Sequence, residues 1–434
     1  MPNEPCASVV GAGLAGCEAA WQLAQSGISV KLFEMKPHKR TPAHCTDEYA
    51  ELVCSNSFRS NRLQNAVGLL KEELRLLDSL IIGAADKTQV PAGGALAVDR
   101  IEFSRLITSA IKNHPKIRVF EGEVTELPEP PAIIATGPLT TDGLSASIEK
   151  LTGTCLHFFD AAAPIVYASS INMEAAFYAS RYGRGSDYIN CPMSQAEYSR
   201  FFNELILAQT VKLHSFEEQS VFEGCVPIEL LAKRGEATLT FGPLKPAGLV
   251  DPRTGKRPYA AVQLRQDNQA ATLYNIVGFQ TNLTFAEQRR VFSLIPGLKD
   301  AEFARYGVMH RNTYLSSPQL LGWDYELKQN PGLYFAGQIT GVEGYVESVA
   351  SGLAASINLS RKLYKKPALD FSKKTAIGAL AHYISNYAGS NFQPMNINYG
   401  IMESLENMQK SKIQRTEEIA KRSLSVISYL KEYS

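Results

Sequence analysis

The stretch ASVVGAGLAG at residues 7–16 decides the fold of this chain. Its first four residues predict a short buried strand, and glycines follow at positions 11, 13 and 16. Residues 14–26 then predict a helix of small side chains, and residues 28–34 alternate apolar and polar side chains as a second strand does. Glu34 ends that strand, 23 residues after Gly11. Together these segments predict a β-α-β unit that binds a dinucleotide.

The three glycines have separate roles in such a unit. The first permits a tight turn, the second lets the backbone approach a pyrophosphate, and the third packs the helix against the strand. The helix amino terminus offers free N–H groups and the positive end of a dipole to the phosphates, and Glu34 can accept hydrogen bonds from ribose hydroxyls. We therefore expect a cofactor to contact Val10, Gly11, Ala12, Gly13, Leu14, Ala15, Gly16 and Glu34.

Two later segments favour FAD over NAD as the dinucleotide. Residues 135–137, ATG, resemble a strand of two-dinucleotide flavoproteins, and residues 334–341 with 344–352 resemble the C-terminal FAD motif of those proteins. In that motif the amino terminus of a helix approaches the flavin end of the cofactor. The further cofactor contacts expected from these segments are Thr136, Gly137, Gly337, Gln338 and Gly344.

A cofactor fold that resumes so late in the chain predicts a split domain. We expect an α/β fold, with a Rossmann-like FAD-binding domain of the glutathione-reductase type, split by an inserted α+β domain and followed by a helical tail. The predicted FAD-binding parts are 1–145 and 321–400, the insertion on the substrate side is 146–320, and the charged tail is 401–434. The helical spacing of apolar side chains predicts one amphipathic helix over 66–82.

Composition narrows the classes of protein that remain. The chain has 434 residues, of which 45% are hydrophobic and 20% charged, as is ordinary for a globular protein of two or three domains. It contains no apolar stretch of about eighteen residues and no signal-peptide pattern, so we expect a cytoplasmic protein without a membrane segment. A net charge of +1 neither indicates nor excludes RNA binding.

The seven cysteines are odd in number and show neither a CxxC pair nor zinc-type spacing, which argues against a disulfide framework and against a metal site. Two of them stand in loops that suggest chemistry. Cys54 lies in ELVCSNSFRS at 51–60, with Arg59 five residues on, and Cys225 lies in FEGCVP at 222–227. Most cysteines are small buried hydrophobes, so composition by itself does not make either thiol catalytic.

Several long segments match those of a known family. They are 9–16, ELVCSNSFR at 51–59, PAGGALAVD at 91–99, FEGCVP at 222–227, FGPLKP at 241–246, NIVGFQTN at 275–282, MHRNTY at 309–314, 335–352 and FQPMNIN at 392–398. On these segments the chain, up to about residue 400, resembles the folate- and FAD-dependent tRNA (uracil-5-)-methyltransferases, the TrmFO family, which is related to the GidA flavoproteins.

The resemblance implies a reaction. NADH or NADPH reduces FAD, methylenetetrahydrofolate supplies a one-carbon unit, and a uridine in the T-arm of tRNA becomes 5-methyluridine. A thiolate adds to C6 of uracil and makes C5 nucleophilic, and a base later removes the C5 proton. By resemblance Cys54 is the nucleophile and Cys225 the base or assisting thiol, although the reverse assignment stays open.

A second set of polar residues is expected at the substrate. An arginine offers a two-pronged donor to a carboxylate or a phosphate, so folate or RNA is the expected ligand. The candidates are Arg59, His310, Arg311 and Asn312.

Other functions remain open at this stage. The same chemistry could act on ribosomal RNA, and a small-molecule FAD oxidoreductase would need neither thiol. A related wobble-uridine-modifying subunit that works with a GTPase is disfavoured, because its long C-terminal helical domain has no counterpart. A flavin-binding adaptor without activity is disfavoured by the many matched polar loops. We expect no metal and no obligatory protein partner.

Overall fold

The computed structural model describes residues 4–41, 43–153, 155–211, 226–389, 392–406 and 411–433. For residues 155–160 and 310–311 it describes the backbone alone. None of the helices in these ranges combines the length and apolar character that a membrane crossing requires.

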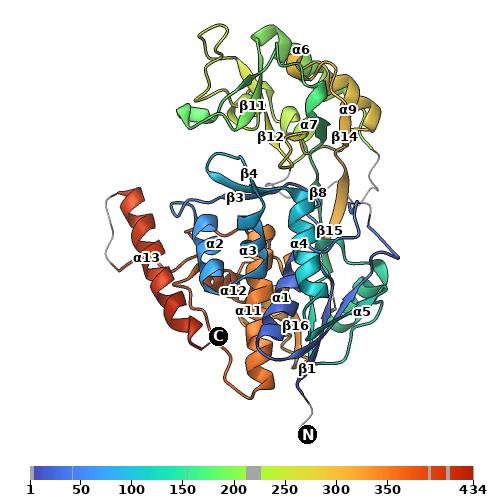
Figure 1. Ribbon diagram of the computed structural model, residues 1–434, viewed down its shortest axis with the longest axis vertical. Helices are drawn as coiled ribbons and strands as arrows, with labels where there is room; N and C mark the ends of the chain where they lie inside the picture. The colour runs from blue at the N-terminus through green and yellow to red at the C-terminus, as the bar shows by residue number, and fades with distance from the viewer. Residues whose placement is uncertain are drawn as a thin grey trace.

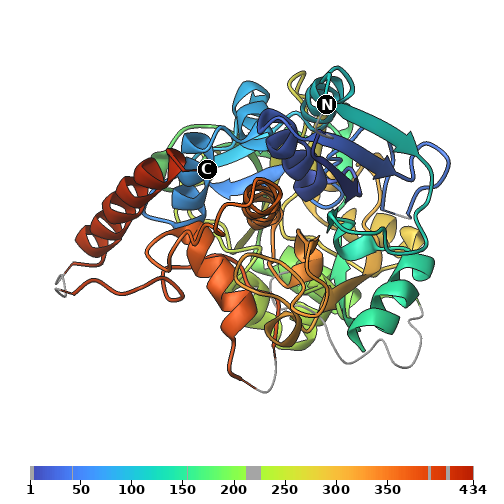
Figure 2. The ribbon, with the colours of Figure 1, turned by 90° about the horizontal axis from the view of Figure 1, so that it is seen from below.

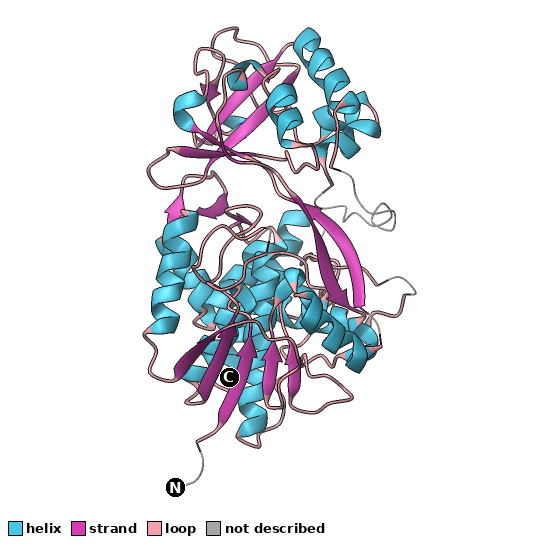
Figure 3. Ribbon diagram, turned by 90° about the vertical axis from the view of Figure 1, so that its right-hand side faces the viewer, coloured by secondary structure: helices cyan, strands magenta, loops and turns pink. Residues whose placement is uncertain are grey.

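The first lobe is built on a parallel sheet whose strands run in the order β16-β7-β1-β2-β6. Each neighbouring pair is parallel, and β1 and β2 pair in register from Cys6 opposite Ser29. The strands are β1 (Cys6–Val10), β2 (Ser29–Glu34), β6 (Ile117–Glu121), β7 (Ala132–Ile134) and β16 (Leu333–Phe335). Figure 3 shows this sheet with helices packed against it. The predicted α/β class with a parallel sheet is therefore confirmed.

The helices of this lobe come from both ends of the chain. They are α1 (Leu14–Gln25), α2 (Ala66–Leu76), α3 (Leu80–Lys87), α4 (Arg100–Lys112), α5 (Asp142–Thr152), α10 (Ser317–Leu320), α11 (Tyr345–Leu363), α12 (Ala376–Asn386) and α13 (Lys412–Lys431), with short 3-10 turns η1 (Gly137–Leu139) and η6 (Gln338–Thr340). Helix α11 lies directly on α1. The approach is so close that a Cβ on Gly352 would stand 2.3 Å from the Ala15 carbonyl oxygen. Only glycine lets the two backbones approach so closely.

The single helix predicted over 66–82 is wrong, because the chain forms two helices there. Helix α2 ends at Leu76, and Asp78 takes a left-handed φ of 56°. Ser79 then caps α3, its Oγ accepting a hydrogen bond from Ile82 N at 3.2 Å. The apolar spacing continues across the break because both helices bury their apolar side chains in the same core. Periodicity alone therefore could not reveal the turn.

The second lobe, as far as its residues are described, is an antiparallel sheet with four α-helices. The strand order is β10-β11-β12-β13-β9-β14. Its elements are β9 (Ile165–Tyr167), β10 (Phe177–Tyr178), β11 (Tyr188–Met193), β12 (Ala260–Gln266), β13 (Leu273–Ile276), β14 (Phe303–Arg305), α6 (Gln195–Leu207), α7 (Ile228–Lys233), α8 (Glu236–Phe241) and α9 (Phe285–Phe292). Phe201, Phe279 and Phe292 are fully buried in a core separate from that of the first lobe.

Two paired strands carry the chain between the lobes. The antiparallel strands β8 (Cys155–Ala161) and β15 (Met309–Leu315) form this connection (Figures 1 and 3). A small sheet of β3 (Ser57–Ser60), β5 (Ala95–Val98) and β4 (Gln89–Val90) lies on the face of the first lobe that meets the second (Figure 1). The boundary expected between residues 145 and 146 falls inside α5, and the one expected after 320 falls at the end of α10.

The C-terminal helix packs on the first lobe. Figure 2 shows α13 along one side of the molecule. Ile419 and Ile427 of α13 are buried in the same core as α2, and the Ser423 hydroxyl donates a hydrogen bond to the buried Glu73 carboxylate. The same carboxylate accepts hydrogen bonds from the first N–H groups of α12, at 2.7 and 2.9 Å. One buried acid therefore joins α2, α12 and α13.

Candidate active site

The glycine turn after β1 has the geometry that a phosphate-binding turn requires. Gly11 has a φ of 97°, and its N–H donates to the Phe33 carbonyl at 2.8 Å. A Cβ on Gly11 would lie 2.7 Å from the Ala135 carbonyl oxygen, and one on Gly16 would lie 1.8 Å from the Gly11 carbonyl oxygen. A Cβ on Gly13 would meet no protein atom within 4 Å. Two glycines are thus fixed by close packing, and the third faces open space.

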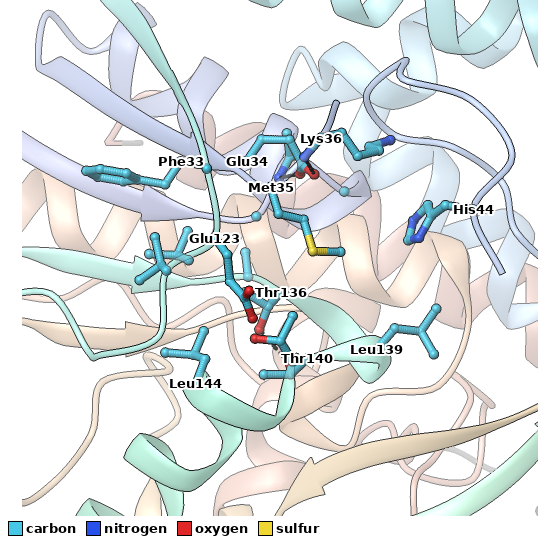
Figure 4. Close-up of a pocket in the computed structure, with 18 of the residues that line it drawn as sticks. Phe33, Glu34, Met35, Lys36, His44, Glu123, Thr136, Leu139, Thr140 and Leu144 are labelled. Atoms are coloured by element: carbon cyan, nitrogen blue, oxygen red, sulfur yellow. Dashed lines mark hydrogen bonds between the residues drawn. The ribbon is translucent and has the colours of Figure 1, made fainter. Parts of the chain in front are cut away.

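A pocket opens at the carboxyl ends of β1, β2 and β7, where open α/β sheets bind their ligands. Figure 4 shows Glu34 and Lys36 on one side of it and Thr136 and Thr140 on the other. The predicted cofactor residues that line it are Val10, Gly11, Ala12, Gly13, Glu34 and Thr136. Leu14, Ala15 and Gly16 form the first turn of α1, and Gly137 begins η1.

Glu34 is held in place at the end of β2. Its Oε2 accepts a hydrogen bond from Ala12 N at 2.8 Å, and its Oε1 accepts one from Lys36 N at 3.0 Å. The side chain is buried but lines the pocket. These two bonds orient the carboxylate and leave it able to accept further hydrogen bonds from hydroxyl groups.

The predicted C-terminal cofactor segment meets the first one at α1. A Cβ on Gly337, whose φ is 84°, would lie 3.0 Å from the Ala15 Cβ. The Gln338 amide donates to Glu343. Gly344, with a φ of 111°, caps the amino terminus of α11, whose first residue is Tyr345. The structure thus brings two segments more than 300 residues apart to one end of the parallel sheet.

Cys54 lies against the first residue of α11. The backbone N–H groups of Cys54 and Ser55 both donate to the Tyr345 hydroxyl oxygen at 3.0 Å. The Cys54 sulfur is half-buried and stands 3.8 Å from the Ala161 carbonyl oxygen. Burial raises the pKa of Tyr345 above its ordinary value. Its hydroxyl therefore stays neutral at physiological pH and fixes the position of the cysteine loop.

Three arginines from separate elements hold the same loop. Arg100 of α4 and Arg305 of β14 donate to the carbonyls of residues 52–53. Arg265 of β12 donates to the Ser55 hydroxyl at 2.6 Å. The surroundings of the Cys54 loop are therefore rich in positive charge, a setting that stabilises a thiolate.

A buried ion pair steadies one of these arginines. The Arg100 guanidinium lies 2.9 Å from the Asp267 carboxylate, and both side chains are nearly inaccessible to solvent. Burial works against the charge of Arg100, but the charge and hydrogen bond of Asp267 outweigh it and raise the pKa of Arg100. The pair joins α4 of the first lobe to the end of β12 in the second.

The remaining predicted site residues differ in where they lie and in how much of them the structure describes. Arg59 has a φ of 61° and its guanidinium bonds the buried Glu347 carboxylate in the first turn of α11, so it is engaged within the chain. His310 and Arg311 lie in β15, and only the backbone of these two residues is described. Cys225 lies outside the described residues.

Asn312 is fully buried. Neither atom of its amide has a hydrogen-bond partner in the part of the chain that the structure describes. Its strand, β15, packs against η1 and η6, which begin at the predicted cofactor residues Gly137 and Gln338.

Comparison with known proteins places the chain in a family. A family model described as glucose inhibited division protein A matches residues 7–367. A protein of Acetivibrio thermocellus named methylenetetrahydrofolate–tRNA-(uracil-5-)-methyltransferase TrmFO is 60% identical over 431 residues, 98% of this chain and 99% of that protein. The chain belongs to the TrmFO family. A protein of the same name from Bacillus licheniformis is 58% identical over 422 residues, 97% of each chain.

A solved structure shares the fold. The form II crystal structure of Aquifex aeolicus GidA aligns with 100% of this chain and 74% of that one, with a TM-score of 0.71 and 15% identity. The likeness concerns the arrangement of elements, which confirms a GidA-like α/β fold.

Sequence reasoning missed the residues that position the cysteine loop. Arg100, Arg265 and Arg305 stand far from Cys54 in the chain, and no local pattern marks them. Tyr345 directly follows Gly344, which was predicted as a cofactor contact, so the C-terminal FAD motif was the signal that could have identified it.

Proposed function

We propose that this protein methylates C5 of a uridine in the T-arm of tRNA, with methylenetetrahydrofolate as one-carbon donor, FAD as cofactor and NADH or NADPH as reductant. The family supports the substrate and donor, since the TrmFO proteins carry both in their names. The observation on which the mechanism rests is the Cys54 thiol, held beside the amino terminus of α11 where the two predicted cofactor segments converge.

The residues present fit FAD. No side chain caps the amino terminus of α1, so its first N–H groups can face a pyrophosphate across the open space at Gly13. Glu34 is oriented to accept hydrogen bonds from a ribose. The unpartnered amide of Asn312 lies on a strand that packs beside the same segments. Bound there, FAD would carry the one-carbon unit and the electrons that the methyl group requires.

The protein's own residues supply the covalent step. In this proposal the Cys54 thiolate forms a bond to C6 of uracil, and the C5–C6 π electrons move into the ring to give an enolate that is nucleophilic at C5. After C5 has gained its carbon substituent, a base removes the C5 proton. The C6–S bond then breaks and restores the thiolate. Cys225 is the candidate base, and exchange of the two roles remains the alternative.

The loop contacts suit this chemistry. The Tyr345 hydroxyl accepts from the N–H groups of the peptide bonds before and after Cys54 and so fixes the backbone on both sides of this residue. Arg265 stabilises negative charge next to the sulfur and also holds the Ser55 hydroxyl. A thiol placed this firmly attacks one position of a bound base, because orientation is set before the substrate arrives.

The decisive experiment measures methyl incorporation into an unmodified tRNA transcript with methylenetetrahydrofolate, FAD and NADH. Wild type should form 5-methyluridine in the T-loop, whereas Cys54→Ala should retain FAD and form none. Cys45→Ala is the matched control, because Cys45 is an exposed thiol in a nearby loop. NADH oxidation without methylation of tRNA would refute the proposal, and ribosomal RNA would then be tested before a small-molecule substrate.

A further inference from the structure

A groove runs between the lobes on the side of β3 and β4. Its walls come from the segment after β3, the β4–β5 hairpin, the segment before β11 and strand β12. Figure 1 shows β3 and β4 facing the lobe that carries β11 and β12. The lining residues that matter here are Arg62, Gly94, Arg181, Tyr182, Arg184 and Gln263.

The groove concentrates positive charge on a chain of net charge +1. Arg62 and Arg184 are exposed, and neither forms an ion pair with a described residue. Arg181 donates to the Ala247 carbonyl at 3.0 Å and to Gln263 Oε1 at 2.9 Å, so its charge also lacks an acidic partner among the described side chains. The Asp187 carboxylate at this rim accepts a hydrogen bond from Gly93 N at 2.6 Å.

Arg184 is held in position by the segment on which it lies. The guanidinium sits over the Tyr182 ring, 5.7 Å from its centroid. Tyr182 has a left-handed φ of 64°, and its N–H donates to the Gly248 carbonyl at 2.7 Å. A Cβ on Gly248 would stand 2.8 Å from the Tyr182 ring. One edge of the Tyr182 ring therefore packs on Gly248, while the ring stays largely exposed and the Arg184 guanidinium lies over it at the surface.

Arg62 lies across the glycine pair of the β4–β5 hairpin. A Cβ on Gly94 would meet the Arg62 guanidinium at 2.9 Å, and Gly93 has a φ of 60°. The Gly93 N–H already donates to Asp187, but the Gly94 N–H has no partner among the described residues, and the missing side chain leaves it open to a close approach by a ligand. This hairpin belongs to the PAGGALAVD segment at 91–99, and the carbonyl of Lys245 in the FGPLKP segment also accepts from Arg181.

The groove lies close to the Cys54 loop. Ser60 lines the groove and lies six residues after Cys54, so at most about 20 Å of extended chain separates them. On β12, Gln263 lines the groove and Arg265, two residues on, bonds Ser55. An RNA that presents a uridine to Cys54 therefore has its neighbouring nucleotides within reach of the groove.

We infer that this groove binds phosphates of the tRNA substrate on one side of the reacting uridine, through the guanidinium groups of Arg62 and Arg184. The inference rests on the proposed function. Unpaired arginines and an exposed backbone N–H group are donors that position a nucleic-acid backbone without reading its sequence. The groove thus sets affinity and register, and the Cys54 loop performs the chemistry.

The test compares two double variants of equal charge change. Arg62→Gln/Arg184→Gln removes both groove charges, and Lys365→Gln/Lys366→Gln removes two exposed charges just after α11. Binding of unmodified tRNA transcript is measured by filter retention from 50 to 200 mM salt, without donor or reductant. Two lost phosphate contacts should reduce the change in Kd over this range roughly tenfold relative to wild type. The lysine variant should behave as wild type.

The binding and methylation assays distinguish failure of the groove inference from failure of the proposed reaction. If both double variants weaken binding equally, general charge accounts for the effect and the groove inference is overturned. The same holds if the arginine variant binds as wild type while methylation proceeds normally. If wild type binds tRNA but methylates none, and the arginine variant alone loses affinity, the groove inference stands and the proposed reaction falls. If the groove inference and the proposed reaction both hold, the arginine variant should show a raised KM for tRNA at an unchanged kcat.

Discussion

Substitution by alanine should have opposite effects at Gly13 and at Gly16: at Gly13 it should weaken FAD binding, and at Gly16 it should destabilise the fold. A methyl group on Gly13 would meet no protein atom within 4 Å, and the backbone there, φ −76° and ψ −169°, is open to alanine. We expect Gly13→Ala to change the free energy of unfolding of the cofactor-free protein by no more than about 1 kcal/mol, because a weaker helix cap offsets a less flexible unfolded chain. The methyl group instead occupies space proposed for the pyrophosphate.

The expected loss of FAD affinity follows from the hydrogen bonds at stake. Displacing a phosphate from one N–H group of α1 costs about 1.5–3 kcal/mol, which is a roughly 10- to 100-fold weaker Kd. Gly16→Ala should act on the fold, because its Cβ would stand 1.8 Å from the Gly11 carbonyl oxygen and α1 must move by about 1 Å or more. That overpacking costs about 1–3 kcal/mol or more of stability.

The assay combines urea unfolding of the cofactor-free proteins with FAD titration followed by flavin fluorescence. Gly83→Ala is the matched control, since its Cβ would also meet nothing within 4 Å but lies within α3. It should bind FAD as wild type and gain up to about 1 kcal/mol of stability. If Gly13→Ala binds FAD as tightly as wild type, the pyrophosphate does not lie at this turn and the assignment is refuted.

Three further substitutions test the loop and the C-terminal helices. Tyr345→Phe leaves the N–H groups of residues 54–55 without their acceptor, so kcat for methylation should fall while FAD affinity, measured by titration, is retained. Arg100→Met strands the buried carboxylate of Asp267 and should destabilise the protein by about 3–5 kcal/mol in urea unfolding, which Arg100→Met/Asp267→Asn should partly restore. Burial raises the pKa of Glu73 from 4.5 to about 7. The folded state therefore keeps a proton that the unfolded chain loses, and stability should fall as pH rises from 4.5 to 7, a slope that Glu73→Gln should remove.

Local rules were sufficient where the chain determines its own conformation over a few residues. The predicted strand, glycine turn, helix and second strand at the amino terminus correspond to β1, α1 and β2. The late cofactor segment likewise forms β16 and α11. In both segments the sequence itself shows two signals. Glycines stand at the turns, where positive φ angles favour them, and the spacing of apolar residues changes from that of a strand to that of a helix.

The same rules failed over residues 66–82, where a neighbour in space decides. The turn at residues 77–79 depends on Glu18 of α1, whose carboxylate accepts hydrogen bonds from the Ser79 hydroxyl and from Ile81 N. No pattern within 66–82 contains that partner, so the two helices were predicted as one. The pairing of Arg59 with Glu347, 288 residues away in the sequence, is likewise invisible to local patterns, and the expected contact of Arg59 with substrate stays a prediction.

The sequence by itself determined the cofactor fold, the family and the identity of Cys54 as a candidate, because these reside in short contiguous strings whose geometry is local. Only the tertiary structure placed Cys54 at the start of α11 and surrounded its loop with Arg100, Arg265 and Arg305. The physical reason is that charge and hydrogen bonding act through space over a few ångströms. A sequence records separation along the chain, and these partners meet only where the two lobes pack against each other.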